Sequence, residues 1–417
     1  MLVFCRPSPH VFGFLLALGC IFLCLLDVRH WGRRDPGSAF FDPDFAFQPS
    51  YSLVRKEQAA AFIEKADNAT NLGEFPKAKQ GHRLCVGIAA KQRKGVRYFR
   101  DTVGSLLEGL TEAEREDISL VSFIANVDPK EHAAYRERWL RTLSNRVLTY
   151  DDIADHGMVK AIKANTTVEH RFKRKPLFDY ATLLDACYAD GAPYVLMIED
   201  DTLAAEGWYA KTTQALDHLE RKKAKTRTIY LRLFYNERLL GWNLEQWPTT
   251  LVTWTLVEAA MGVVLFGAAR LVPCTSSILT RWTILAILLF FNPLCTILFF
   301  LGGRLTLAGP PNGLHRMDTY GCCSQALLFQ RTRIPELIDY YRSQNSGYVD
   351  VLTERYAEQH NLARWALTPG VFQHVGTISS KASAPSRWGR KNTENIWNFS
   401  FEMFHAEESR PSHIRQA

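Results

Sequence analysis

The sequence lacks several features that would place it in a common class of protein. It has no block of lysine and arginine long enough to form a nucleic-acid-binding arm, although its formal net charge is +7, and no zinc-finger spacing accompanies that charge. Only nine of its 417 residues are cysteines, and five of these lie in or beside apolar stretches. We therefore expect no nucleic-acid partner and no disulfide framework of the small secreted kind.

Long apolar runs are what the sequence has instead, at residues 11–26, 251–269 and 282–301. Runs of this length with few charges are typical of helices that cross a membrane, although two buried core helices are the alternative for the second and third. The first run is short enough for a cleaved signal peptide, but no small-x-small cleavage site follows it. The sequence therefore predicts an integral membrane protein with an N-terminal anchor.

The second and third runs are separated only by the turn-like stretch 270–281, which predicts an antiparallel transmembrane hairpin. Arg270 and Arg281 place this turn in the cytosol under the positive-inside rule, and so both polar parts of the chain on the lumenal side. Three arginines at residues 29–34 oppose this orientation for the first segment. Three glycosylation sequons fall in the parts that this topology makes lumenal, at Asn68, Asn165 and Asn398.

The polar remainder of the chain alternates strand and helix signals from Arg83 onward, which is the pattern of an α/β domain. Short apolar stretches predict strands and longer amphipathic ones predict helices. The predicted strands are residues 84–90, 118–126 and 194–198, and the predicted helices are 98–110, 131–143, 176–189 and 349–359. Residues 35–79, which precede this domain, are rich in proline and charge and are interpreted as a stem.

The strand at 194–198 runs directly into three adjacent carboxylates, Glu199, Asp200 and Asp201. Open α/β sheets bind their ligands at the carboxyl ends of strands. Three adjacent carboxylates repel one another, and a divalent cation such as Mn²⁺ or Mg²⁺ would relieve that repulsion and hold a diphosphate. The basic loop at 91–94, between the first strand and a helix, suits the same anionic ligand. A solvated acidic loop is the alternative interpretation.

Residues 195–201 resemble the strand and DxD-type motif of GT-A glycosyltransferases. Three further features narrow the resemblance: a membrane hairpin inside the catalytic domain, the vicinal pair Cys322–Cys323, and the segment 372–380. With the N-terminal anchor, they resemble the Golgi GPI-N-acetylgalactosamine transferase family. The resemblance implies transfer of N-acetylgalactosamine from UDP-GalNAc to a mannose of the GPI-anchor glycan, with Mn²⁺ or Mg²⁺ as cofactor. It also implies a multi-pass protein of the Golgi membrane whose catalytic domain is lumenal.

The resemblance also implies roles for the acidic residues. Asp201 is expected to bind the metal directly, and Asp200 and Glu199 to support the metal, the ribose or the sugar of the donor. His374 is expected to complete the metal or diphosphate site, because many GT-A enzymes carry a C-terminal histidine there. A structural histidine with ordinary hydrogen bonds is the alternative for His374.

The end of the first strand is expected to meet the nucleotide. Ala89 and Ala90 are small enough to allow its close approach, and Lys91 and Arg93 would counter the charge of its phosphates. A basic loop that is merely solvated is the competing interpretation for these residues.

An inverting transfer needs a base for the proton of the acceptor hydroxyl, and two acidic residues qualify. Asp350 is our first candidate and Glu354 the second, although any helix start favours acids because of its dipole. The family resemblance further suggests a disulfide between Cys322 and Cys323, and two reduced thiols packed in the core are the alternative.

Two other functions compete with this one. The stretch 372–376 is also similar to N-acetylglucosaminyltransferases that act on N-glycans, which would change both donor and acceptor. A non-enzymatic three-span adaptor is the second alternative, in which Glu258 and Asn292 mark a functional site within the membrane.

Taken together, the sequence predicts an α/β, GT-A-like glycosyltransferase domain that is interrupted by a two-helix transmembrane hairpin and preceded by a transmembrane anchor. The expected segments are a cytosolic tail (1–10), an anchor (11–28), a lumenal stem (29–82), the first part of the domain (83–250), a transmembrane helix (251–270), a cytosolic turn (271–281), a second helix (282–302), the second part of the domain (303–400) and a C-terminal tail (401–417).

Overall fold

The computed structural model describes residues 9–164, 167, 173–222, 227–242, 247–317, 321–377 and 392–404. The chain forms two compact units, each built from segments that are far apart in the sequence. The membrane unit comprises residues 1–48 and 237–310, and the α/β unit comprises residues 49–236 and 311–417.

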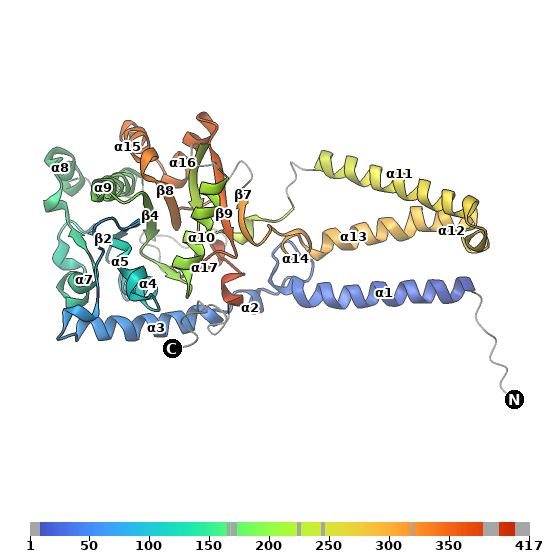
Figure 1. Cartoon of the computed structure of the whole chain (residues 1–417), viewed down its shortest axis with the longest axis horizontal. Helices are drawn as coiled ribbons and strands as arrows, with labels where there is room; N and C mark the ends of the chain where they lie inside the picture. Colours follow the sequence, from blue (N-terminus) through green and yellow to red (C-terminus); the bar gives the residue numbers. More distant parts are fainter. Residues whose placement is uncertain are drawn as a thin grey trace. The chain divides into compact units, whose positions relative to one another are not determined.

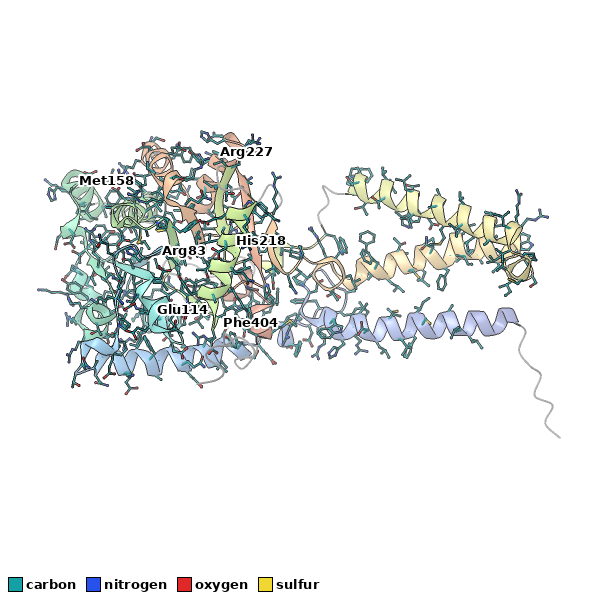
Figure 2. All side chains as sticks on the ribbon, in the orientation of Figure 1. Arg83, Glu114, Met158, His218, Arg227 and Phe404 are labelled. Carbon is teal, nitrogen blue, oxygen red and sulfur yellow. A yellow bond between two sulfur atoms is a disulfide. The ribbon has the colours of Figure 1, made fainter. Side chains whose placement is uncertain are left out.

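The membrane unit contains three stretches that are long and apolar enough to cross a membrane, Leu15–Arg34, Trp247–Leu271 and Arg281–Gly302. Their side chains project outward from the ribbons along the whole length of each helix (Figure 2). Phe290 and Trp282 are 76% and 82% exposed. An apolar surface of this extent is stable only in a non-aqueous environment, which confirms the prediction of a membrane protein with an N-terminal apolar helix.

The α-helices described in this unit are α1 (Pro9–Trp31), α11 (Trp247–Leu271), α12 (Arg281–Ala286), α13 (Asn292–Gly302) and the short α2 (Pro43–Ala46) and α14 (Arg304–Ala308). A π-helical turn at Ile287–Phe291 joins α12 to α13 just before Pro293, whose ring cannot continue an undisturbed helix. The indole of Trp254 on α11 donates to the hydroxyl of Thr296 on α13 at 2.9 Å. The two apolar helices therefore contact each other, which supports the predicted hairpin.

The α/β unit is built on a mixed sheet of eight strands in the order β3-β2-β1-β4-β8-β6-β9-β7 (Figure 1). Strand β1 runs parallel to both β2 and β4, whereas β8 is antiparallel to β4. The strands are β1 (Leu84–Ala90), β2 (Ile118–Ile124), β3 (Arg146–Leu148), β4 (Tyr194–Glu199), β6 (Thr228–Arg232), β7 (Gly313–Arg316), β8 (Ala326–Gln330) and β9 (Ala363–Thr368). A mixed α/β fold with a large sheet is thereby confirmed.

Helices cover both faces of this sheet, so its central strands β1 and β4 are almost entirely apolar. Successive residues of β1 point to opposite faces and enter two different cores, Val86 on one face and Cys85 on the other. Cys85 also forms a disulfide with Cys187, which joins β1 to α9. The main helices are α3 (Ser50–Asp67), α4 (Tyr98–Leu107), α9 (Lys175–Asp190), α10 (Trp208–Arg221), α15 (Ile334–Ser343) and α16 (Val349–Gln359).

The segment interpreted as a stem differs most from expectation. Its helix α3 belongs to the α/β unit, and Arg55, Ala59 and Ile63, four residues apart on one face, are completely buried. A side chain at Gly104 of α4 would come within 2.5 Å of the Ala59 carbonyl oxygen, so glycine is needed where these helices cross. The globular unit therefore starts at residue 49, because an amphipathic helix needs a core to cover its apolar face.

Three smaller expectations also need correction. The helix expected at 131–143 is divided into α6 (Ala133–Arg136) and α7 (Arg138–Leu143) by an extended Glu137. Phe401 is fully buried, so residues 401–404 are anchored in the fold and not part of a tail. Asn398, the first residue of a sequon, has a structural role, since its buried side-chain amide donates to two main-chain carbonyls. Asn68 is exposed, and Asn165 lies outside the described residues.

Candidate active site

A cavity of about 580 Å³ opens in the α/β unit where the carboxyl ends of β1 and β4 meet. This volume is typical of sites that bind small molecules. The other walls are the loop 323–325, the start of α16 and the residues around His374. Of the residues predicted from the sequence, this cavity brings together Ala89, Lys91, Arg93, Glu199, Asp200, Asp201, Asp350 and His374.

Asp200 and Asp201 follow β4 and are both 6% exposed. Arg93 lies between them and donates to Asp200 Oδ1 at 2.5 Å and to Asp201 Oδ2 at 2.7 Å. The main-chain amide of Lys91 donates to the second oxygen of Asp200 at 3.1 Å. Thr102 of α4 fixes this strand end, because its buried hydroxyl donates to the Asp200 carbonyl. The basic loop therefore contacts the acidic strand end directly.

His374 reaches the same place because strand β10 (Phe372–His374) pairs with β5 (Thr202–Ala204) and puts His374 opposite Thr202. Its Nε2 lies 3.5 Å from Asp201 Oδ2, and its Nδ1 is 3.2 Å from the carbonyl oxygen of Ile396. A side chain at Gly376 would come within 2.2 Å of Asp201 Oδ2, so only glycine allows this approach.

The two aspartates differ in electrostatic character. Burial raises the pKa of Asp201, but hydrogen bonds and charge from His374 and Arg93 outweigh burial and hold this pKa well below its ordinary value. Burial raises the pKa of Asp200, Arg93 opposes that rise and the adjacent Asp201 adds to it. Burial alone would lower the pKa of His374, but the carboxylate of Asp201 raises it above its ordinary value. Asp201 is therefore the aspartate with the firmer negative charge.

These residues fit a divalent cation in their chemistry, since carboxylate oxygens and an imidazole are ligands that Mn²⁺ accepts. The buried Oδ1 of Asp201 has no hydrogen-bond partner within the described part of the chain, which leaves it available as a ligand. Across the residues that the structure describes, no three such side chains already converge as a metal site. Arg93 instead supplies the positive charge between the two aspartates.

Glu199, the last residue of β4, is held by the loop that precedes β8. Its carboxylate accepts hydrogen bonds from the Ser324 hydroxyl at 2.6 Å and from the Gln325 amide at 3.4 Å. These two partners were not identified from the sequence, because they lie more than a hundred residues away and are joined to Glu199 only by the pairing of β4 with β8.

Ala89 and Ala90 separate in the structure. Ala89 lines the cavity, whereas Ala90 is completely buried and its carbonyl accepts the amide of Ala125. Successive residues of a strand point to opposite faces, so only one of two neighbours can face a ligand. Ala90 therefore belongs to the core of the sheet.

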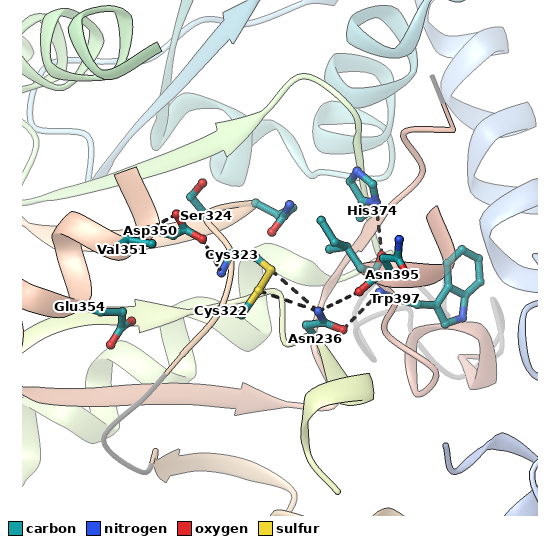
Figure 3. The surroundings of a disulfide bond; sticks show 12 residues. Asn236, Cys322, Cys323, Ser324, Asp350, Val351, Glu354, His374, Asn395 and Trp397 are labelled. Atoms are coloured by element: carbon teal, nitrogen blue, oxygen red, sulfur yellow. Dashed lines mark hydrogen bonds between the residues drawn. A yellow bond between two sulfur atoms is a disulfide. The ribbon is translucent and has the colours of Figure 1, made fainter. Parts of the chain in front are cut away.

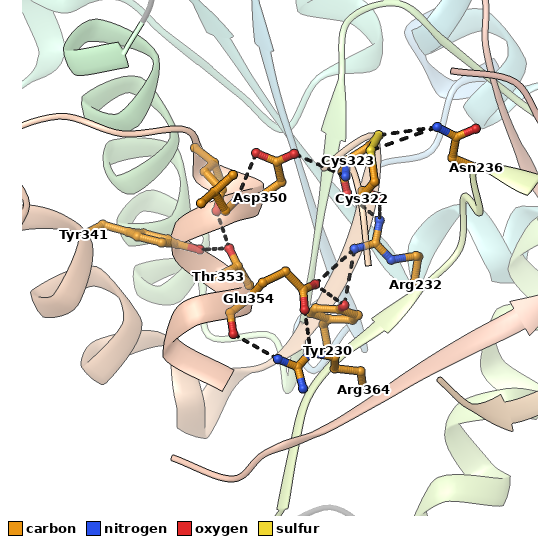
Figure 4. Close-up of polar contacts among 12 residues, drawn as sticks. Tyr230, Arg232, Asn236, Cys322, Cys323, Tyr341, Asp350, Thr353, Glu354 and Arg364 are labelled. Carbon is orange, nitrogen blue, oxygen red and sulfur yellow. Dashed lines mark hydrogen bonds and ion pairs between the residues drawn. A yellow bond between two sulfur atoms is a disulfide. The ribbon is translucent and has the colours of Figure 1, made fainter. Parts of the chain in front are cut away.

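The two candidate bases also separate. Asp350 lines the cavity and accepts hydrogen bonds from the main-chain amides of Cys323 at 3.2 Å and Val351 at 2.9 Å. Glu354 is not among the residues that line it, and its carboxylate binds Arg364 and Arg232 in the core (Figure 4). A carboxylate engaged by two buried arginines cannot easily take a proton from a substrate, so Glu354 is corrected to a structural role.

A second polar group in the cavity was missed from the sequence. Lys175 at the start of α9 donates to Asp179 at 2.6 Å and to the carbonyl of Ala125 at 2.9 Å. Asp179 in turn accepts the hydroxyl of Tyr150. Lys175 and Asp179 are four residues apart on a helix, a spacing that favours an ion pair. Nothing in the sequence around this pair indicates that it lies beside a ligand.

The vicinal cysteines form a disulfide, as the family resemblance suggested. Cys322 and Cys323 are joined, and Cys323 lines the cavity beside Ser324 (Figure 3). The alternative of two reduced thiols is therefore wrong for this structure.

Comparison with known proteins shows the family to which the chain belongs. The chain is similar to the mouse (Mus musculus) alpha-1,3-mannosyl-glycoprotein 4-beta-N-acetylglucosaminyltransferase C, with 24% identity over 146 residues. That match covers 33% of this chain and 30% of the relative. A much longer match, over residues 84–373, is to the family described as GPI-N-acetylgalactosamine transferase PGAP4, a family of glycosyltransferases. Because it covers more than half of the chain, this protein belongs to the GPI-N-acetylgalactosamine transferase PGAP4 family, as its motifs predicted.

Proposed function

We propose that this protein transfers N-acetylgalactosamine from UDP-GalNAc to a mannose of the GPI-anchor glycan. One observation carries the proposal: in a chain of this family, an acidic strand end, a basic loop and a separate carboxylate all face one cavity. The acidic and basic groups suit the diphosphate of a nucleotide sugar, and the separate carboxylate suits the acceptor. A membrane-embedded acceptor also explains why the chain carries long exposed apolar helices.

We call Arg93, Asp200, Asp201 and His374 the donor wall. Asp201, Asp200 and His374 would hold Mn²⁺ or Mg²⁺, with Glu199 in support. When bound, the cation supplies positive charge that stabilises the UDP leaving group. Lys91 and Arg93 add positive charge for the diphosphate, and Ala89 leaves room for the nucleotide at the end of β1. In this assignment Arg93 exchanges its aspartate partners for phosphate oxygens.

We call Asp350 and the Cys322–Cys323 turn the base wall. Asp350 would take the proton of the acceptor hydroxyl as that oxygen attacks the sugar carbon, with inversion at that carbon. Its two hydrogen bonds come from main-chain amides, so the carboxylate is oriented without being neutralised by a cation. Two carboxylate sites with different surroundings can thus serve donor and acceptor separately.

We further propose that the α/β unit is a GT-A-like domain in the lumen of the Golgi, interrupted between β6 and β7 by a transmembrane hairpin. The disulfides Cys85–Cys187 and Cys322–Cys323 support an oxidising compartment. The hairpin would hold the active site near the bilayer, where a lipid-linked glycan is presented.

A transfer assay with two donors and two acceptors tests this function. Purified protein in detergent is offered UDP-GalNAc or UDP-GlcNAc, with either a GPI glycan or an N-glycan as acceptor, in the presence of Mn²⁺. We expect transfer only for UDP-GalNAc with the GPI glycan, and its loss when the metal is chelated. Transfer of N-acetylglucosamine to the N-glycan would instead favour the activity named for the mouse relative. No turnover of any UDP-sugar would contradict an enzymatic function.

A further inference from the structure

The carboxylate of Asp350 is tied to a distant part of the chain by one hydrogen bond. Of the two amides that donate to it, Val351 is its neighbour on α16, whereas Cys323 belongs to the turn before β8. The position of the Cys322–Cys323 turn therefore decides where the carboxylate points into the cavity.

This turn has a backbone that needs support. Cys323 has φ +79°, in the left-handed region that residues with a side chain rarely adopt. Such a conformation is unfavourable for a residue with a side chain and persists only where the surroundings hold it. The groups that contact the turn from the core are thus part of what sets its shape.

Arg232, the last residue of β6, supplies that contact. Its side chain is only 1% exposed, and its Nη1 donates to the carbonyl oxygens of both Cys322 and Cys323 (Figure 4). One guanidinium therefore holds both peptide units of the turn from the side opposite the cavity. The other nitrogen of the guanidinium, Nη2, contacts Tyr230 and Glu354, so the planar group serves two sets of partners at once, whereas lysine has one nitrogen.

The charge of Arg232 is balanced behind the turn. Its Nη2 lies 3.4 Å from Glu354 Oε1 and 3.2 Å from the hydroxyl of Tyr230, and Arg364 binds the other oxygen of Glu354 at 2.5 Å. A side chain at Gly321 would come within 2.9 Å of Arg232 Nη2, so the glycine before the cysteines leaves the space that the guanidinium fills. The arginine is thus fixed in direction by its partners.

The same turn is also linked to the donor wall. The side-chain amide of Asn236 lies 3.8 Å from Cys323 Sγ and donates to the carbonyl of Asn395 at 3.2 Å (Figure 3). Ile396, the residue after Asn395, provides the carbonyl that contacts His374. The turn, which belongs to the base wall, is therefore linked to His374 of the donor wall through Asn236 and residues 395–396.

We propose that Arg232 is a positioning residue for the transfer reaction: by holding both carbonyls of the Cys322–Cys323 turn, it fixes the Cys323 amide and thereby the direction of the Asp350 carboxylate. This inference rests on the proposed function, in which Asp350 takes the proton of the acceptor. The contact between Arg232 and the turn could not be predicted from the sequence, because the whole membrane hairpin separates them along the chain.

A double-mutant cycle between Arg232→Lys and Asp350→Asn tests the proposal. Lysine keeps a positive charge, but its single nitrogen cannot take the places of both Nη1, which contacts the two carbonyls, and Nη2, which contacts Tyr230 and Glu354. We expect Arg232→Lys alone to lower kcat about 10–100-fold, as a small misplacement of a catalytic group does, with the KM for the UDP-sugar little changed. In the Asp350→Asn background, Arg232→Lys should lower kcat hardly any further, because the carboxylate that it misplaces is already absent.

Arg115 provides a matched control. It is also a buried arginine that donates to two main-chain carbonyls, those of Ile118 and Leu143, but it lies outside the cavity. Arg115→Lys should match Arg232→Lys in any general loss of stability and leave kcat near the wild-type value. The proposal would be overturned if Arg232→Lys and Arg115→Lys lost kcat equally. It would also be overturned if Arg232→Lys lowered kcat by the same factor in the wild type and in the Asp350→Asn variant.

Gly321→Ala keeps the test decisive if Arg232→Lys does not fold. The added methyl group would press on Arg232 Nη2 without removing a charge, and we expect the same loss of kcat and the same dependence on Asp350. An unchanged kcat in this folded variant would contradict the proposal. If the wild type transfers no sugar at all, the proposed function fails first. Wild-type transfer with an active Asp350→Asn variant would instead remove the base role of Asp350 and the positioning role of Arg232, while the transferase function stands.

Discussion

The donor wall and the base wall hold carboxylates in opposite ways. Asp200 and Asp201 are buried and contacted by cationic side chains, whereas Asp350 is partly exposed and held by main-chain amides. Asp201, whose pKa is lowered by His374 and Arg93, keeps its charge through a reaction, which suits a role in binding a cation or a diphosphate. Asp350 faces the cavity with a carboxylate that no cationic side chain contacts in the described part of the chain, which suits the proposed acceptor side. This difference is the basis on which we propose that the donor wall binds the nucleotide and that the base wall takes the proton.

The base wall contains the same contrast on a smaller scale. Asp350 and Glu354 are four residues apart on α16, and therefore on one face of the helix. The first faces the cavity, and the second lies one turn deeper, between Arg232 and Arg364. Depth below the surface, and not residue type, separates a candidate catalytic group from a structural one.

The largest expected effect is at the donor wall. Asp201→Asn removes the firm negative charge, and we expect kcat/KM for UDP-GalNAc to fall by about a thousandfold or more, since charge stabilisation by a bound metal is worth several kcal/mol. Initial rates at saturating Mn²⁺ measure the loss. Asp185→Asn, which changes a surface aspartate paired with Arg342, is the control and should keep full activity.

Asp350→Asn should reduce transfer by about a hundredfold or more, because the base is lost, while UDP still binds with wild-type affinity. Transfer rates and a UDP titration measured on the same preparation separate the two properties. A similar loss of UDP binding would show that Asp350 serves the donor, and the distinction between the walls would be wrong.

Glu354→Gln should act on stability before it acts on catalysis. Two buried arginines lose their shared carboxylate, and breaking a buried ion pair of this kind costs about 3–5 kcal/mol. Thermal unfolding in detergent should show a clearly lower midpoint than for Asp350→Asn. A variant that is as stable as the wild type but inactive would return Glu354 to the candidates for the base.

Arg93→Lys should have a moderate effect, since lysine keeps the charge but cannot contact both aspartates with one planar group. We expect about a tenfold rise in the KM for UDP-GalNAc and a smaller change in kcat, as for a group that positions a phosphate. Steady-state kinetics against donor concentration distinguish the two constants. A change confined to kcat would argue that Arg93 acts after donor binding.

The smallest expected effect lies behind the donor wall, at His132. Burial lowers the pKa of His132 to about 4 from 6.5, so the unfolded chain binds this proton more readily. The stability that the neutral ring provides is complete above pH 6.5 and is lost as the pH falls toward 4. His132→Asn keeps an acceptor for the Ala134 amide. As the pH falls from 7 to 5.5, the free energy of unfolding should decrease by about 1 kcal/mol less in this variant than in the wild type. Unfolding midpoints across this range provide the comparison.

The sequence predicted those parts of the fold that local patterns determine. The strand Tyr194–Glu199 and its acidic end are recognisable because a continuous apolar stretch meets three carboxylates. The residues of helix α3 were assigned to a stem, because nothing in their own sequence shows that Ala59 packs against Gly104 of another helix. Patterns show which face is apolar, and only the fold shows what covers it.

The candidate site was predictable to a similar degree. Asp201, His374 and Asp350 were identified, and the structure brings them to one cavity. Glu354 and Ala90 were assigned beside them, because spacing along a helix or strand does not reveal depth. Contacts across the hairpin, such as that of Arg232 with the cysteine turn, join residues about 90 positions apart, and no local pattern encodes them.

UDP binding in the presence of Mn²⁺ tests the central claim most directly, when measured by calorimetry on the wild type, Asp201→Asn and Asp350→Asn and paired with their transfer rates. We predict that both variants lose transfer, that Asp201→Asn also loses UDP binding, and that Asp350→Asn binds UDP as tightly as the wild type. Retained UDP binding in Asp201→Asn, or its loss in a folded Asp350→Asn variant, would contradict the assignment of donor and acceptor to the two walls.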